Sequence, residues 1–216
     1  MMGVLFSEDR IDFRGKLTTG EIKQIVRNGG ADTLQTDTLP LDVSTLQRLN
    51  EEYFAKYPHT ELRIYTYGSC DLSLLKVMDK VRKLSVEASS GILGIDAIYQ
   101  LPALKHLCVE TPKIEDEDFL VKIPASLESL DLDIAAKSFD LKPLTRFTEL
   151  KVLGLHKCKK NIEAISELKQ LQSLKLHGIT PDSYSFVNEL PRLKNLAISG
   201  GNTGDLSELY GNKTIT

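Results

Sequence analysis

Residues 150–155 read Leu-Lys-Val-Leu-Gly-Leu, and the same spacing returns at residues 171–176 as Leu-Gln-Ser-Leu-Lys-Leu. Further matches to this frame begin at Val81, Leu104, Leu127 and Leu193, and Leu62-x-Ile64 fits its last two positions. The middle positions are 62, 84, 107, 130, 153, 174 and 196, which are separated by 22, 23, 23, 23, 21 and 22 residues. Chance spacing of an abundant residue would not keep this phase, so the chain is built from an internal repeat.

The last two apolar positions of each match, two residues apart, predict a short strand with both side chains on one face. A second apolar cluster precedes most of these strands: Ile98 and Leu101, Leu144 and Phe147, Ile165 and Leu168, Phe186 and Leu190. These clusters predict short helices or 3₁₀ turns that close each coil on its other side. One coil cannot bury both clusters alone, whereas stacked coils bury them against each other beneath a parallel sheet.

The repeat resembles the leucine-rich repeat family, in a short bacterial form with repeats of 21–23 residues, over roughly residues 55–216. The resemblance implies an α/β solenoid with a parallel concave sheet and short helices or 3₁₀ turns on the convex side. The family motif L-x-x-L-x-L-x-x-N/C-x-L places Asn or Cys where its side chain forms a ladder of buried hydrogen bonds. Only Cys158 matches here, and the equivalent positions hold Tyr67, Ser89, Pro112, Ala135, Ile179 and Gly201.

We expect residues 1–55 to form an N-terminal capping region with helical repeat units, and residues 56–216 to form about seven repeat strands. Thr18 or Thr19 can cap a helix that ends at Asn28-Gly29-Gly30. A strand near Thr33–Asp37 follows, and Ser44 can start a second helix that ends before Pro58. Val4–Phe6 and Ile11–Phe13 are interpreted as a hairpin or edge strand that covers the first coil.

The C-terminal repeat is predicted to be incomplete. Leu206-Ser-Glu-Leu209 copies Ile165-Ser-Glu-Leu168, and by that alignment Ile215 begins an eighth strand one residue before the sequence ends. Either the chain is a fragment of a longer protein, or a partner covers this edge, because an exposed strand edge invites pairing. Self-association as a homodimer through this edge is therefore one functional alternative.

Residues that alternate with the strand leucines should point outward and form columns about 4.8 Å apart from strand to strand. The most distinctive column joins acidic residues to two histidines, with Asp131 from the neighbouring column beside it. We expect a protein partner of unknown identity, with a basic or polar segment, to bind the concave face there. The predicted contact residues are Tyr65, Glu87, Glu110, Asp131, Asp133, His156 and His177.

Three weaker hypotheses concern a metal site, a catalytic cysteine and a phosphate-binding loop. Asp133, His156 and His177 are residue types that suit zinc, although no tight ligand spacing supports a metal site. Cys108 lies between the outward-facing His106 and Glu110, but a nucleophile needs a base and an oxyanion site around it. The glycine-rich residues 199–204 lack the ending of a phosphate-binding loop and are interpreted as a tight turn. We therefore expect no enzyme activity and no cofactor.

Composition and charge indicate which classes of protein function the chain does not fit. The formal net charge is -3, whereas nucleic-acid binders usually carry a strong basic excess. No apolar run approaches the roughly 20 residues of a membrane helix, and the first ten residues show no signal-peptide pattern. Three widely spaced cysteines suggest free thiols in a reducing compartment. The sequence therefore predicts a cytoplasmic protein that binds neither nucleic acid nor membranes.

Overall fold

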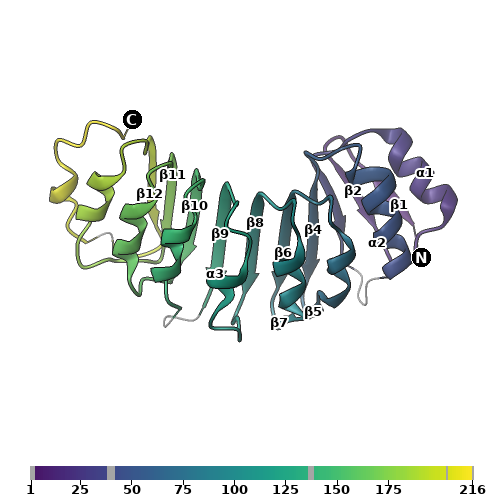
Figure 1. Ribbon diagram of the computed structural model, residues 1–216, viewed down its shortest axis with the longest axis horizontal. Coiled ribbons are helices and arrows are strands. Elements are labelled where there is room, and N and C mark those ends of the chain that lie inside the picture. The colour runs from purple at the N-terminus through teal and green to yellow at the C-terminus, as the bar shows by residue number, and fades with distance from the viewer. Residues whose placement is uncertain (1–2, 38–41, 136–138, 203, 216) are drawn as a thin grey trace. The chain divides into compact units, whose positions relative to one another are not determined.

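The computed structural model describes residues 3–37, 42–135, 139–202 and 204–215. The chain forms two compact units, residues 1–111 and residues 112–216. In each unit the strands lie side by side in one layer, and helices cover one face of that layer (Figure 1). The opposite face of each layer is called the open sheet face below.

Unit 1 contains a sheet that is mostly parallel. Its strands are β1 (Val4–Phe6), β2 (Arg10–Phe13), β3 (Thr33–Thr36), β4 (Glu61–Thr66), β6 (Lys83–Ala88) and β8 (His106–Thr111). β1 pairs with β2 in antiparallel orientation, and each later neighbour is parallel, from β2–β3 to β6–β8. The predicted hairpin and the predicted strand near Thr33 are therefore confirmed.

Two longer helices precede the first strand of the regular repeat. α1 (Thr19–Asn28) starts with a capping box in which the Thr18 hydroxyl accepts from the Glu21 amide and the Glu21 carboxylate accepts from the Thr18 amide at 2.7 Å. α2 (Val43–Leu49) continues into a π-helical turn, η1 (Asn50–Phe54). The prediction that Ser44 starts this helix is wrong, because Asp42 is the N-cap and its carboxylate accepts from the Thr45 amide at 2.8 Å.

A second, small sheet in unit 1 was not expected from the sequence. β5 (Ser69–Asp71) and β7 (Gly91–Leu93) are parallel, and they lead into the 3₁₀ helices η2 (Ser73–Val77) and η3 (Ile95–Gln100). Cys70 is buried in this small sheet, paired in register with Ile92. The loop between a repeat strand and its helix is therefore ordered by pairing with the loop of the next repeat.

The described residues of unit 2 repeat the same plan, with four parallel strands and short helices. The strands are β9 (Ser129–Ile134), β10 (Val152–His156), β11 (Ser173–His177) and β12 (Asn195–Ser199). The helices are α3 (Phe119–Lys122) and the 3₁₀ helices η4 (Lys142–Arg146), η5 (Ile162–Glu167), η6 (Ser185–Glu189) and η7 (Ser207–Leu209). The 3₁₀ turns predicted from the second apolar cluster are confirmed. Ile215 is not part of a strand, and Thr216 lies outside the described residues.

The core of each unit follows the leucine frame. In unit 2, Leu130, Leu153 and Leu174 lie side by side in register, and each is 0% exposed. Leu144 and Ile165, from the helices on the other side of the layer, are also 0% exposed. The two apolar clusters of each repeat thus meet in one interior, as the sequence predicts.

A polar residue precedes many of the 3₁₀ helices and fixes how they start. The carboxylates of Asp71, Asp140 and Asp205 accept from the backbone amides of Ser73, Lys142 and Ser207, two residues ahead, at 2.9, 2.8 and 2.8 Å. Ser183 takes the same role for η6 with its hydroxyl. Such side chains satisfy a backbone donor that the helix leaves unpaired. This signal was overlooked in the sequence, where an Asp or Ser stands two residues before the helix each time.

The Lys142 and Ser207 amides lower the pKa of Asp140 and Asp205 below the usual range. The pKa of Asp71 is lowered chiefly by the Ser73 hydroxyl, which also donates to its carboxylate, and then by the Ser73 amide. A carboxylate with a lowered pKa in the folded state stabilises the protein above its unfolded pKa of about 4. That contribution is lost as the pH falls through the lowered value.

We therefore expect the thermal midpoint to fall between about pH 5 and pH 2, measured by circular dichroism. Asp140→Asn should reduce the difference between the midpoints at pH 7 and pH 2.5. As a control, Asp182, whose side chain is fully exposed, is replaced by Asn in the same way. Equal pH dependence in the Asp140 variant and the wild type would contradict the role given to this carboxylate.

Candidate functional site

The outward residues of unit 1 form the predicted columns. Tyr65, Glu87 and Glu110 occupy equivalent positions on β4, β6 and β8, where Tyr65 pairs in register with Glu87 and Glu87 with Glu110. Tyr65 and Glu87 are half-buried, and Glu110 is exposed. These three predicted contact residues therefore stand in one row on the open sheet face.

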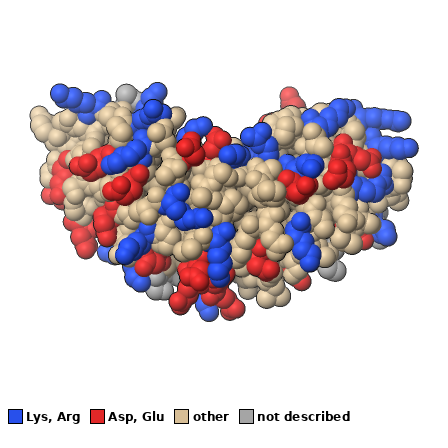
Figure 2. All heavy atoms as spheres, viewed as in Figure 1, with Lys and Arg blue, Asp and Glu red and all other residues tan. Residues whose placement is uncertain are grey.

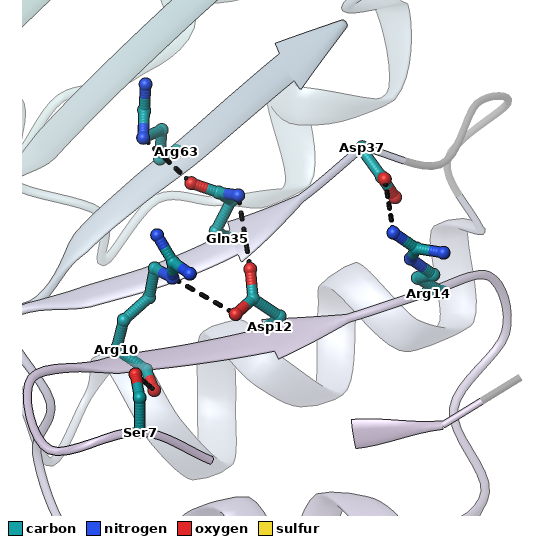
Figure 3. A network of polar contacts seen from close by, with 7 residues as sticks. All are labelled: Ser7, Arg10, Asp12, Arg14, Gln35, Asp37 and Arg63. Atoms are coloured by element: carbon teal, nitrogen blue, oxygen red, sulfur yellow. Dashed lines mark hydrogen bonds and ion pairs between the residues drawn. The ribbon is translucent and has the colours of Figure 1, made fainter. Parts of the chain in front are cut away.

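A chain of polar contacts crosses the same face and holds Arg63 in place (Figure 3). Arg63 donates to both carboxylate oxygens of Glu87, at 2.6 Å from Nε and 2.7 Å from Nη2. Its third donor, Nη1, reaches Gln35 at 2.9 Å, and Gln35 donates to Asp12 at 3.1 Å. The two-pronged Arg–carboxylate pair is the strong form of this interaction and fixes the guanidinium plane. Arg63 was not among the predicted site residues.

Arg63 also supports an aromatic pair. Its guanidinium carbon lies 5.3 Å from the centre of the Tyr65 ring, within the range of a cation–π contact. The Tyr65 ring meets the Tyr67 ring edge to face, with centres 5.2 Å apart. The pKa of Tyr65 is raised, chiefly because its side chain hydrogen-bonds to that of Tyr67.

In unit 2 the structure brings Asp131, Asp133 and His156 together. His156 Nδ1 lies 3.1 Å from Asp133 Oδ2, and His156 Nε2 lies 3.5 Å from Asp131 Oδ1. The imidazole is only 15% exposed. On the next strand the His177 ring centre is 5.1 Å from that of His156, and His177 Nδ1 lies 3.0 Å from the Ser199 hydroxyl. All four predicted contact residues of this unit thus lie in one contiguous patch.

Gly154 makes this arrangement possible. It stands beside Asp131 in register on β10, and a Cβ at this position would lie 2.6 Å from the Asp131 carboxyl carbon. The absence of a side chain lets the Asp131 carboxylate lie across the strand toward His156. A glycine inside a strand weakens it but permits such a close approach.

Comparison with protein-family models and with curated proteins gives no match. Solved structures do match. An internalin C2 of Listeria monocytogenes aligns with a TM-score of 0.59 and 20% identity, over 92% of this chain and 82% of that chain. An internalin (inlF) of the same species gives 0.60 and 16%, over 96% and 72%. A chain of the Toll–Spätzle complex of Drosophila gives 0.59 and 12%, over 90% and 31%.

The chain has the leucine-rich repeat fold. Its departure from the family motif is visible at the position of the buried ladder. Cys158 is buried, and its thiol lies 3.4 Å from the Ile134 carbonyl oxygen, as the motif implies. Ser89 also bonds back to the preceding repeat, since its hydroxyl donates to the Tyr67 carbonyl. Tyr67, at the equivalent position of an earlier repeat, is instead turned outward, and the residue is 82% exposed.

The residues of the three weaker hypotheses have other contacts in the structure. Among the described residues, no three His, Cys, Asp or Glu side chains are placed to hold a metal ion. Both nitrogens of His156 face carboxylates, and one nitrogen of His177 faces Ser199. In the glycine-rich segment, Gly200 and Gly204 adopt positive φ and Asn202 accepts from the Gly204 amide, which is typical of a turn; Thr203 lies outside the described residues.

The three cysteines of the repeats form no disulfide among the residues described. Burial raises the pKa of Cys70 to about 12 and that of Cys158 to about 11. These two thiols therefore stay protonated at neutral pH, and a protonated thiol is a poor nucleophile. Cys108 is half-buried on the open sheet face. In the described part of the chain, no helix is long and apolar enough to cross a membrane.

Proposed function

We propose that the chain is a protein-interaction module, which binds a protein partner through the open sheet faces of its repeats. The observation that carries this proposal is the row of outward side chains in register, held by contacts with one another. Arg63 is fixed by Glu87 and Gln35, and His156 is enclosed by two carboxylates. Side chains that are ordered before binding lose less conformational entropy when a partner arrives.

The balance of charges supports recognition of a partner by direct contacts rather than by long-range electrostatic attraction. The chain carries 27 Lys and Arg residues against 30 Asp and Glu residues, and on the helical side, which Figure 2 shows, residues of both signs are interspersed. A chain with this slightly acidic balance does not attract a polyanion such as nucleic acid over long range. One of the similar solved structures is a complex between two proteins, which is in keeping with a protein partner.

The test is affinity capture with the full chain, compared with a variant carrying Glu110→Gln, Asp133→Asn and His156→Gln together. We expect the captured partner to be reduced at least tenfold, because such central contacts contribute about 2 kcal/mol or more to binding. A matched variant on the helical side, Glu163→Gln with Glu189→Gln, changes two exposed carboxylates and should retain the partner. Equal capture by both variants would place the binding surface elsewhere.

Self-association is the second candidate, and one observation favours it. Leu196 and Ile198 on β12 are partly exposed, whereas their counterparts Leu174 and Leu176 are 0% exposed. An apolar hollow at this end is lined by Leu196, Ile198, Leu206, Leu209, Asn212 and Ile215. Sedimentation of the wild type and of the Ile198→Glu variant distinguishes the two functions, since only an edge-to-edge dimer would dissociate in the variant.

We also propose that the chain is located in the cytoplasm.

A further inference from the structure

Tyr67 is an exposed aromatic residue in a fixed position. It follows β4 directly, the residue is 82% exposed, and its ring packs edge to face on Tyr65. A large exposed ring contributes binding area at low entropic cost, because a tyrosine side chain has only two rotatable angles. Tyr and Arg are also the residue types most enriched among the strongest contacts of protein interfaces.

The turn that carries Tyr67 is held by the next repeat. The Ser89 hydroxyl donates to the Tyr67 carbonyl, and the Ser89 amide donates to the Thr66 carbonyl at 3.3 Å. The Ser90 amide donates to the Gly68 carbonyl at 3.2 Å. The backbone on both sides of Tyr67 is therefore anchored, which defines where the ring stands before any partner binds.

Near the Tyr65–Tyr67 pair, one acidic side chain has no basic partner in the part of the chain that the structure describes. Arg63 is paired with Glu87, and Lys83 stands in register beside Glu61. Among the described residues Glu110, two strands from Tyr65, has no ion-pair partner and is exposed. The open sheet face of β4, β6 and β8 thus offers an exposed ring and an uncompensated carboxylate.

We propose that Tyr65, Tyr67 and Glu110 form a docking surface for a basic segment of the protein partner. One Lys or Arg side chain of that segment lies against the Tyr67 ring, and a second pairs with the Glu110 carboxylate. This inference rests on the proposed function and adds the chemistry of the partner to it. Cations bind aromatic faces within about 6 Å of the ring centre, and Arg does so most often.

The spacing of the strands specifies the segment further. Tyr65 and Glu110 are separated by two steps of about 4.8 Å, and Tyr67 lies two residues beyond Tyr65 along the chain, so the Tyr67 and Glu110 anchoring points are roughly 12 Å apart. An extended peptide advances about 3.3 Å per residue, so about four residues cover that distance. Side chains four positions apart in an extended segment also point to the same face, so the segment is extended, with basic residues four positions apart.

The test is selection from a library of random dodecapeptides on the immobilised full chain, followed by affinity measurement of the selected peptides. We expect enrichment of Arg and Lys four residues apart. Tyr67→Ala should weaken the selected peptides about five- to twentyfold, and Tyr67→Phe, which keeps the ring, about twofold or less. Glu110→Gln should weaken binding and reduce its dependence on salt concentration.

Tyr210→Ala is the matched control, because Tyr210 is 96% exposed and lies in unit 2. It should leave peptide affinity unchanged. Selected peptides without basic enrichment, or equal affinity for the Tyr67→Ala variant and the wild type, would overturn the inference. Either result leaves the proposed function standing if capture of the partner still depends on the open sheet face, so the two failures are distinguishable.

Discussion

Replacing Leu153 by alanine is expected to lower the free energy of unfolding by about 2–5 kcal/mol. Leu153 lies in the middle of unit 2, in register with Leu130 on one side and Leu174 on the other, and is 0% exposed. The truncation removes buried methyl groups and leaves a cavity between stacked repeats that cannot collapse independently. Urea denaturation followed by circular dichroism measures the loss.

Val152→Ala is the matched control for this substitution. Val152 is the preceding residue on the same strand, but it points to the open sheet face and is 44% exposed. Its replacement should change the free energy of unfolding by about 0.5 kcal/mol or less. Similar losses in the two variants would contradict the assignment of inward and outward positions along β10.

Replacing Gly94 by alanine is expected to destabilise unit 1 by about 2–4 kcal/mol. Gly94 has a φ of 62°, which costs an L-residue energy whatever its surroundings. In addition, a Cβ here would lie 2.7 Å from the Ser73 backbone nitrogen and 3.0 Å from an Asp71 carboxylate oxygen. The strain and the clash act at the point where two successive repeats meet on the helical side.

Gly211→Ala separates those two causes. Gly211 has a φ of 82°, and a Cβ there would meet nothing within 4 Å. It should therefore show only the conformational cost, about 1–2 kcal/mol at most. Thermal unfolding of both variants measures the difference. A Gly94 variant no less stable than the Gly211 variant would show that the loops before η2 and η3 separate at little cost.

The leucine frame was sufficient to predict the repeat strands and their register within each unit, because strand side chains alternate with a period of two. Once Leu153 is placed inward, the opposite orientation of His156 follows, and the row joining Asp133, His156 and His177 could be predicted. The helix start at Asp42 could not be separated from one at Ser44, because both residues are good N-caps.

Contacts between repeats were harder to predict, since they depend on the direction in which each side chain points, which the repeat pattern does not specify. The sequence places Tyr67 and Ser89 at a position that is usually buried, and only the structure shows that the tyrosine turns outward while the serine bonds back. The ion pair between Arg63 and Glu87 joins two adjacent strands, and its residues belong to neighbouring columns of outward side chains. Nor did the sequence indicate that the Asp131 carboxylate lies beside Gly154, in the space that a side chain would otherwise fill.

The alternation along each repeat strand has an evolutionary consequence. On β10, Leu153 and Leu155 belong to the interior, while Val152 and His156 face solvent to different degrees. Under the proposed function, outward positions other than Gly154, where a side chain would clash with Asp131, can change with the ligand at little cost to the scaffold. Mutations at the inward positions are removed whatever the ligand. On β10 the proposed recognition and the folding of the chain therefore depend on alternate residues, the even-numbered ones outward and the odd-numbered ones inward.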